Sequence, residues 1–381
     1  MKKNYKIKKL IKNTIVSAVA LIGLGTEVFA QDNINIGVLR FTSHSAAFIA
    51  YEKDYFKEAG LKAKLVPFQA AAPMAVAIAS GDIDYGVTAI SGALVNLAEK
   101  GAIRIIGGAL TEEKGVDGQK ILVSNKAYAS GVRKASDLRG RSFGLTQTGS
   151  SFHYMASQIA RKEGFSSKEM SLKPLQKVGA IIGALKSGQI DAWSIVPHIA
   201  KALHKSGGAK IIGDVADYID GYQITTIFTS KNNAIKKRDL TKRFLSAYSK
   251  GIKEFNDVMV DKKRGSKAIE ATTRLIHKYV YTSRPYEKAA GSIQAGSMRL
   301  QPNGRLNLTS VKHQLNWFKA EKLVPGSASI KNLVDASSSW DVVLSGVASN
   351  NVSLRNKTGN NYDVISISGT LHHGNGASNS E

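Results

Sequence analysis

Two short loops carry the side chains best suited to binding a small molecule. The first contains Thr42, Ser43 and His44, and the second runs from Thr146 to Ser151. Each loop stands between an apolar segment and a segment with helical periodicity. Hydroxyls and free backbone N–H groups are therefore expected at the positive end of a helix dipole, which suits an anion. The same residues are also ordinary helix N-caps, and one side chain can serve both purposes.

Positions in and near these loops predict distinct roles. Gly149 lets the backbone approach a ligand closely, while Ser150 and Ser151 supply hydroxyls, so this loop is the best candidate for holding an anionic head group. His44 is suited to donating a hydrogen bond to a carboxylate or to stacking on a ring, although a lone histidine is more often structural. Trp193 is suited to a stacking wall, and a buried core position is an equally good interpretation.

The predicted ligand-binding set combines hydroxyl, amide and aromatic groups and contains no carboxylate. It therefore favours an organic anion, aromatic ones included, over a polyamine or a metal ion. The set is Phe41, Thr42, Ser43, His44, Ile90, Ser91, Thr146, Gln147, Gly149, Ser150, Ser151, His153, Trp193 and Tyr222.

Several classes of enzyme lack their usual sequence motifs here. The 381 residues include no cysteine, which excludes disulfides, thiolate metal sites and cysteine nucleophiles. The chain has no Gly-x-Ser-x-Gly elbow, no His-Glu-x-x-His motif and no phosphate-binding loop. Ser43 and His44 are adjacent in sequence, which does not make a catalytic triad. We therefore expect a protein that is not an enzyme and that uses no cofactor and no metal.

The first thirty residues have the order of a secretory signal peptide. A lysine-rich start is followed by the apolar stretch 15–24 and the small-residue end Val28-Phe29-Ala30, so cleavage is expected before Gln31. Without a cysteine the mature chain has no site for lipid attachment, and no second apolar run is long enough to span a membrane. We expect a freely soluble protein of the periplasm.

The chain is strongly basic, with a formal net charge of +24. The predicted signal peptide contains six lysines and one glutamate, so its removal leaves 24 − 5 = +19. The basic residues are dispersed and no nucleic-acid-binding motif accompanies them, so a solvated basic surface is favoured over a nucleic-acid partner. Such a surface also steers anionic ligands toward a cleft.

Strand-like and helix-like segments alternate, which predicts an α/β fold with mostly parallel sheets flanked by helices. A first series has strands at 35–39, 62–67, 85–89 and 103–110 and helices at 46–58, 70–79 and 91–99. A second series has strands at 120–124, 142–145, 171–175, 192–196 and 210–213, a helical turn at 135–140, and helices at 152–164, 179–187 and 198–204. A strand at 222–228 and helices at 237–260, 268–279, 285–291 and 308–321 follow.

The two series repeat one order of events. Residues 79–86 (ASGDIDYG) and 186–193 (KSGQIDAW) each end a helix and start a strand. This predicts two lobes with a groove between them, and the strands at 120–124 and 222–228 are expected to cross between lobes. Ligands sit beyond the carboxyl ends of strands in such sheets. The predicted boundaries are 1–30 for the signal peptide, 32–119 plus 222–341 for lobe 1, 120–221 for lobe 2 and 345–381 for a flexible Ser/Asn/Gly-rich tail.

These motifs resemble those of the SsuA/THI5-like (NMT1-like) substrate-binding proteins of ABC importers. The matching segments, in order, are Gly37-Val38-Leu39, Thr42-Ser43-His44, 79–87, Asp137–Gly140, Ser142-Phe143-Gly144, 146–154 and 185–192. The resemblance covers about Asn33 to Asp341. The phrases SGDIDYG and DLRGRSFG are fairly specific for the family and carry little information about the ligand.

The resemblance implies a two-lobe periplasmic-binding-protein fold of the second topological type. It implies capture of a small organic anion, of the sulfonate, nitrate, taurine or organic-acid type, and delivery to a membrane permease with an ATPase subunit. We expect a monomer. The alternative is a binder of a pyrimidine or thiamine-precursor-like heterocycle, with Trp193, Tyr154 and Gln223 as stacking and amide groups. Family members that make a thiamine pyrimidine use a cysteine-rich motif, which this chain lacks.

Overall fold

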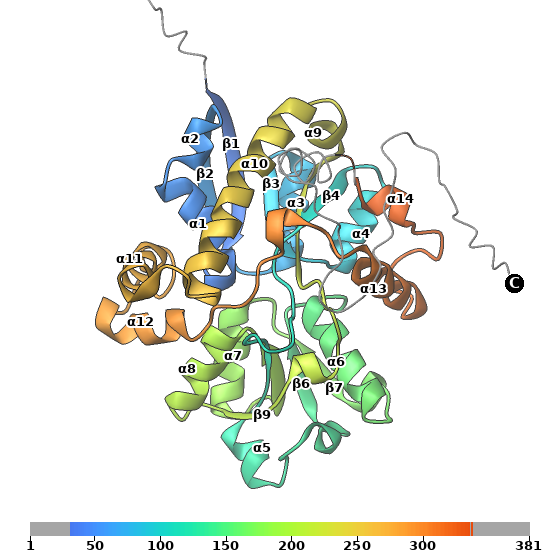
Figure 1. Ribbon diagram of the computed structural model, residues 1–381. Coiled ribbons are helices and arrows are strands. Elements are labelled where there is room, and N and C mark those ends of the chain that lie inside the picture. Colours follow the sequence, from blue (N-terminus) through green and yellow to red (C-terminus); the bar gives the residue numbers. More distant parts are fainter. Residues whose placement is uncertain (1–30, 336, 338–381) are drawn as a thin grey trace, which may run out of the picture. The chain divides into compact units, whose positions relative to one another are not determined.

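A computed structural model describes residues 31–335 and 337 of the chain (Figure 1). The predicted signal peptide at 1–30 and the predicted tail at 345–381 lie outside the described residues. Within the described part, no helix is both long and apolar enough to cross a membrane.

The first sheet has the strand order β2-β1-β3-β10-β4. β1 pairs in parallel with β2 and β3, whereas β10 is antiparallel to β3 and β4. Four of the five strands therefore run the same way, and the exception is the strand that the chain adds last. The strands are β1 (Asp32–Leu39), β2 (Leu61–Phe68), β3 (Tyr85–Ala89), β4 (Ile103–Gly108) and β10 (Thr225–Ser230). The first lobe's helices are α1 (Ser45–Glu52), α2 (Tyr55–Glu58), α3 (Ala71–Ser80), α4 (Gly92–Glu99), α9 (Lys231–Ile235) and α10 (Arg238–Phe255).

The second sheet repeats this pattern in the order β7-β6-β8-β5-β9. β6 is parallel to β7 and β8, and β5 is antiparallel to β8 and β9. Both sheets are thus mostly parallel, as predicted. The strands are β5 (Lys120–Val123), β6 (Ser142–Leu145), β7 (Ser171–Pro174), β8 (Ala192–Ile195) and β9 (Lys210–Asp214). The second lobe's helices are α5 (Asn125–Ala129), α6 (Ser151–Lys162), α7 (Val178–Ser187) and α8 (Pro197–Lys205).

Equivalent scaffold positions in the two sheets stand 107 residues apart. Asp84 Oδ2 accepts the Asn35 backbone N–H at 2.7 Å, and Asp191 Oδ2, at 191 − 84 = 107, accepts the Ser142 N–H at 2.9 Å. Both α3 and α7 end on a glycine with positive φ, where a side chain would be strained: Gly81 at 84° and its counterpart 107 residues later at 73°.

A close contact beneath each sheet repeats with the same offset. A Cβ on Gly37 would lie 2.6 Å from Ile83 Cδ1. A Cβ on Gly144 would lie 2.6 Å from Ile190 Cδ1, and both pairs of positions differ by 144 − 37 = 190 − 83 = 107. A side chain at either strand position would force the isoleucine that follows each SG turn to shift, because that isoleucine packs directly against the strand. The structure therefore repeats the scaffold that the sequence predicts from residues 79–86 and 186–193.

Two chain segments, 109–119 and 215–224, connect the sheets. They pair through an antiparallel bridge between Thr111 and Gln223. A later stretch joins them, because the Thr111 N–H donates to the Arg299 carbonyl at 3.1 Å and Leu110 bridges Leu300. The crossing region therefore consists of three neighbouring chain segments.

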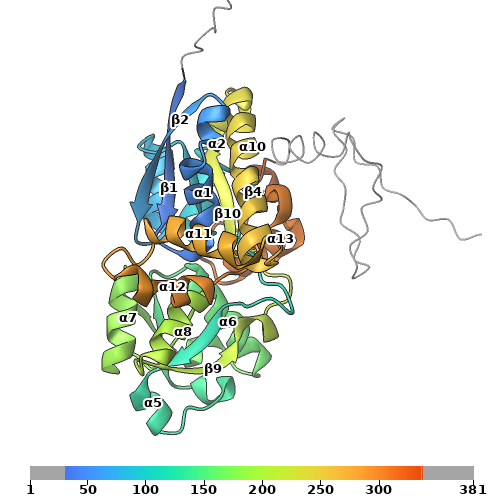
Figure 2. The same cartoon turned by 60° about the vertical axis from the view of Figure 1, so that its left-hand side comes forward.

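The helices after β10 contact both lobes. α11 (Gly265–His277) packs on α1, while α12 (Tyr286–Gln294) packs on α8 of the second lobe and lies beside it in both views (Figure 1, Figure 2). α13 (Leu308–Ala320) contacts α6 through two hydrogen bonds: the Tyr154 hydroxyl lies 2.8 Å from His313 Nδ1, and Trp317 Nε1 donates to Ser157 Oγ at 2.9 Å. α14 (Ile330–Leu333) contacts α4.

The predicted element order is correct, and several details differ. The helix expected at 46–58 is broken at Asp54, whose φ of 58° is left-handed. The strands expected to cross between lobes instead lie inside the sheets, as β5 and β10, and β10 begins only at Thr225. α10 changes into a π-turn at 256–260, because the Asn256 side chain bonds the Leu300 backbone through both its oxygen and its nitrogen.

Several short helices begin at a local side-chain cap. α5, α9 and α14 were not predicted, and each begins after a serine whose hydroxyl accepts a backbone N–H: Ser124, Ser230 and Ser329. The 3₁₀ turns are Thr42–His44, Ala135–Leu138, Ser167–Glu169, Val215–Asp217 and Pro302–Gly304.

Candidate ligand cavity between the lobes

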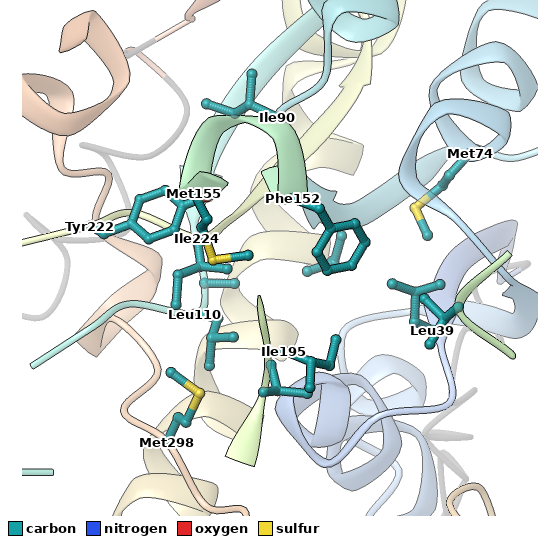
Figure 3. Close-up of a cluster of buried hydrophobic side chains, with 14 of the residues drawn as sticks. Leu39, Met74, Ile90, Leu110, Phe152, Met155, Ile195, Tyr222, Ile224 and Met298 are labelled. Carbon is teal, nitrogen blue, oxygen red and sulfur yellow. The ribbon is translucent and has the colours of Figure 1, made fainter. Parts of the chain in front are cut away.

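A small cavity lies where the two sheets face each other. Its volume is about 50 Å³, room for a few water-sized groups. The apolar wall comes from both lobes and includes Phe152, Ile195 and Leu39, which lie around the same space in Figure 3. The full apolar lining is Leu39, Phe41, Ala70, Ala71, Ala89, Leu110, Phe152, Val178, Ile195, Val196 and Ile224. The polar lining is Ser43, His44, Thr88, Gln119, Thr146, Ser150, Ser151 and Thr225, so no lining residue has a carboxylate, lysine or arginine side chain.

Strand direction explains why these residues meet. Leu39, Ala89 and Ile195 are the last residues of the parallel strands β1, β3 and β8. The antiparallel strands contribute their first residues or the residue just before, Thr225 for β10 and Gln119 for β5. One edge of each sheet therefore faces the cavity, in agreement with the rule that ligands sit at the carboxyl ends of parallel strands.

Several helices begin at the cavity wall. The lining includes the first residues of α3 and α7, Ala71 and Val178, and the residue before α8, Val196. Ser150 and Ser151 stand at the start of α6. None of these four helices has a side-chain hydrogen bond at its N-cap. Their positive dipole ends therefore converge on the cavity from both lobes, which favours a negative charge there.

Buried polar atoms at the wall lack partners. Ser43 Oγ, Ser150 Oγ and Gln119 Nε2 are buried and make no hydrogen bond within the described residues. Leaving such groups unpaired costs about 1–3 kcal/mol each, so a ligand that pairs with them gains that energy. Ser43 and Ser150 are equivalent in the internal repeat, since 150 − 43 = 107. They place one hydroxyl on each side of the cavity.

His44 is a neutral part of the wall. Its Nδ1 accepts the Leu39 backbone N–H at 3.2 Å, which places the ring proton on Nε2. Complete burial lowers the pKa of His44 to about 3. The ring also meets Phe41 edge to face, with centroids 6.0 Å apart. His44 therefore offers an uncharged donor, and the helix ends supply the positive potential.

Backbone contacts between the lobes close the rim. The Gly92 N–H, at the start of α4, donates to the Gly149 carbonyl in the loop before α6 at 2.9 Å. The Val178 N–H donates to the Gln69 carbonyl at 3.4 Å. With the α13–α6 hydrogen bonds, these contacts hold the two walls together around the cavity.

Six of the fourteen predicted ligand-binding residues line this cavity. They come from both predicted loops: Phe41, Ser43, His44, Thr146, Ser150 and Ser151. The other eight lie outside the lining: Thr42, Ile90, Ser91, Gln147, Gly149, His153, Trp193 and Tyr222.

The polar residues outside the lining have local roles. Ser91 caps α4 by accepting the Leu94 N–H at 3.2 Å, and His153 Nδ1 accepts the Gly149 N–H at 3.2 Å. Gly149 has a φ of 78° and serves the rim through its carbonyl. Gln147 contributes its carbonyl to the same loop by accepting the Ser150 N–H at 3.0 Å.

The remaining residues outside the lining are buried. Trp193, Tyr222 and Thr42 have no exposed surface, and Ile90 is nearly as buried. Trp193 packs against Phe152, which itself reaches the cavity, with ring centroids 5.5 Å apart. The core interpretation of Trp193 thus describes its place in the structure.

Most of the apolar wall was not predicted. Leu39, Ala89 and Ile195 carry the same positional signal as the serine loops, because each ends a parallel strand. Leu110, Gln119 and Ile224 belong to the crossing segments, and only the three-dimensional pairing of those segments brings them to the cavity. Among the described residues there is no group of three or more His, Asp or Glu side chains that could hold a metal ion.

Comparison with known proteins gives a family and a fold. The model of the NMT1/THI5 like family matches residues 41–257, more than half of the chain. No curated protein matches the chain in sequence.

Solved structures share the two-lobe fold at low identity. The alkanesulfonate-binding protein SsuA of Xanthomonas axonopodis pv. citri, bound to MOPS, is 19% identical with a TM-score of 0.62, over 81% of this chain and 98% of that one. The periplasmic nitrate-binding protein NrtA of Synechocystis PCC 6803 is 11% identical with a TM-score of 0.66, over 83% and 89%. The desulfurization enzyme DSZB is 14% identical with a TM-score of 0.54, over 83% and 100%. These likenesses establish a periplasmic-binding-protein fold.

Proposed function

Because the chain belongs to the NMT1/THI5-like family, we propose that it is an exported solute-binding protein that captures a small organic anion between its lobes. The observation that carries this proposal is the pair of unpartnered serine hydroxyls, Ser43 and Ser150, at a cavity on which helix N-termini converge. An anion pairs with these donors and with the helix dipoles at once.

The cavity walls support a particular kind of anion. A volume of about 50 Å³ accepts a small head group with a short apolar body. Phe41, Phe152 and the aliphatic side chains surround that body, while Ser43 and Ser150 meet the charged end. Short sulfonates and small organic acids satisfy both requirements, whereas nitrate satisfies only the requirement for a small charged group.

The residues on which the heterocycle alternative was based have other partners or lie in the core, and none of them lines the cavity. Gln223 Nε2 donates to the Leu110 and Thr225 carbonyls, and its Oε1 accepts the Asn307 N–H at 2.9 Å. Tyr154 bonds His313, and Trp193 is in the core. Gln119 is the one amide at the wall, so a neutral pyrimidine remains a comparison compound in the test.

We also propose that the anion is bound without chemical change. Ser43 and His44 both line the cavity, but His44 Nδ1 is engaged by the Leu39 amide and its Nε2 carries the proton. No base is therefore poised to activate the serine. In the proposed role, the protein is a monomer in the periplasm. It releases the anion to a membrane permease that works with an ATPase subunit.

A thermal-shift panel with matched neutral compounds tests this proposal. Ethanesulfonate is paired with ethanesulfonamide and benzoate with benzamide, and nitrate, taurine and uracil are added. A ligand present at 100 times its Kd stabilises the folded state by about 2.7 kcal/mol. We expect a rise in Tm with an anion, not with its amide, and loss of that rise in the Ser150→Leu/Ser151→Leu variant. Equal shifts with both members of each pair, or an unchanged response of the variant, would contradict the proposal.

A further inference from the structure

A second and larger hollow lies apart from the ligand cavity. Its volume is about 550 Å³, within the range of small-molecule pockets. It lies between α7 and α8 of the second lobe and the segment that joins α11 to α12. We call it the basic groove and define it by Ile182, Lys186, Leu203, Tyr281, Arg284 and Lys288. It shares no lining residue with the ligand cavity.

The floor of the basic groove is apolar. Ile182 from α7 and Leu203 from α8 form one side, and the Tyr281 ring forms part of the other. Tyr281 is held in place because its hydroxyl lies 3.0 Å from both the carbonyl and Nδ1 of His198. A floor of this kind accepts a hydrocarbon chain.

The rim of the basic groove carries one sign of charge. Lys186, Arg284 and Lys288 line it, and no carboxylate does. Neither lysine forms an ion pair with a described residue, and the Arg284 guanidinium lies 4.6 Å from the Tyr281 ring centroid. Two uncompensated ammonium groups and a guanidinium above an apolar floor complement an amphipathic anion.

We propose that the basic groove is a second binding site, for a small anion with an apolar chain such as a medium-chain carboxylate. The chain lies on Ile182 and Leu203, and the carboxylate meets Lys186 and Lys288. The volume and the one-sided charge favour this occupant over a neutral lipid, which would leave the cations without a partner.

Isothermal titration of the full mature protein with decanoate, below its micelle concentration, tests the proposal. We expect saturable binding, and decan-1-ol should bind at least tenfold more weakly. Lys186→Glu/Lys288→Glu should lower decanoate affinity at least tenfold. Lys168→Glu/Lys173→Glu, a charge-matched control on exposed second-lobe positions, should leave it unchanged.

A floor variant makes the test independent of charge. Ala202 lines the groove on α8, so Ala202→Phe should place a ring on the apolar floor and lower decanoate affinity at least tenfold while the response to the small anions of the thermal-shift panel persists. Absence of saturable binding to the wild-type protein would overturn the proposal. So would equal losses in the groove and control lysine variants, or full retention of binding by a folded Ala202→Phe variant.

Discussion

The two halves of the ligand cavity share a scaffold and differ in their walls. Positions 107 residues apart keep the same chemistry beneath the sheets, as in Gly37 and Gly144 or Asp84 and Asp191. At the cavity, some equivalent positions carry different side chains. The position equivalent to Leu39 is Thr146, the one equivalent to His44 is Ser151, and the one equivalent to Thr88 is Ile195. Other lining pairs keep their chemistry: Ser43 and Ser150 both present a hydroxyl, and the pairs Ala71/Val178 and Ala89/Val196 are apolar in both halves.

This contrast separates fold from specificity. The matched residues beneath the sheets, Gly37 with Gly144 and Asp84 with Asp191, do not line the cavity. The unmatched pairs make the wall asymmetric, because Leu39, His44 and Thr88 of one lobe correspond to Thr146, Ser151 and Ile195 of the other. A ligand with a charged end and an apolar body fits such a cavity in one orientation, with the paired serines at its charged end.

The largest expected effect comes from a buried carboxyl group in the crossing segments, where the two halves differ. The residue equivalent to Glu112 in the other half is the apolar Ile219, since 219 − 112 = 107. Burial raises the pKa of Glu112 to about 7 from 4.5. Between these values the folded state keeps a proton that the unfolded chain has lost, so stability falls as pH rises from about 4.5 to 7 and is level above. At 1.36 kcal/mol per pKa unit, Glu112→Gln should gain up to about 3 kcal/mol over wild type at pH 8 and little at pH 4.

Paired melting curves isolate this effect. Burial lowers the pKa of His44 and His198 to about 3, so both proteins should lose stability as pH falls below about 6.5. The difference between the wild-type and Glu112→Gln curves removes that shared trend. Exposed Glu287→Gln is the control. If the stability of wild type and of Glu112→Gln changed with pH in parallel, the raised pKa of Glu112 in the crossing segment would be refuted.

The scaffold glycines test whether the halves are equivalent. Gly37→Val and Gly144→Val each force a side chain against an isoleucine, which should cost about 1–3 kcal/mol of unfolding free energy in urea. Gly183→Ala is the control: its Cβ meets nothing within 4 Å, and it should be neutral or stabilising. Tolerance of valine in one half alone would break the equivalence on which the comparison rests.

The paired serines test the symmetric part of the wall. Ser43→Ala and Ser150→Ala should each weaken binding of the captured anion by about tenfold, because each removes one charge-assisted hydrogen bond. Calorimetric titration measures the loss, and the exposed Ser171→Ala is the control. A loss confined to one of the two serines would mean that a single lobe holds the charged end.

The smallest expected effect concerns the contact between α13 and α6. Tyr154→Phe removes the hydroxyl that bonds His313 across the lobes, which should weaken the closed state by about 1 kcal/mol and anion affinity a few-fold. Tyr218→Phe is a matched control, because its hydroxyl donates to Glu163 inside the second lobe at 2.7 Å. Equal affinity losses in both variants would show that Tyr154 acts on folding rather than on closure.

The sequence predicted the α/β order, the repeat and the two serine loops, since these depend on local periodicity and turn chemistry. Loop position did not decide which side chains point inward: Thr42 and Ser43 are adjacent, yet only Ser43 lines the cavity. Gln119 and Leu110 could not be found from local patterns, because their place depends on the pairing of distant crossing segments. The basic groove combines α7 and α8 with the segment that joins α11 to α12, which is distant in sequence, so no local pattern predicts it.

The central claim is that both lobes close on one small anion. The chain has no cysteine, so Lys64→Cys and Lys173→Cys, on the edge strands β2 and β7, can carry two spin labels without background. Pulsed electron–electron double resonance then measures the distance between the lobes with and without each anion of the panel. We expect a broad distance distribution that becomes short and narrow with the anion that raises Tm, and this change should need far more anion in the Ser43→Ala/Ser150→Ala variant. An anion that binds tightly while the distance distribution stays the same, in wild type and variant alike, would contradict the central claim.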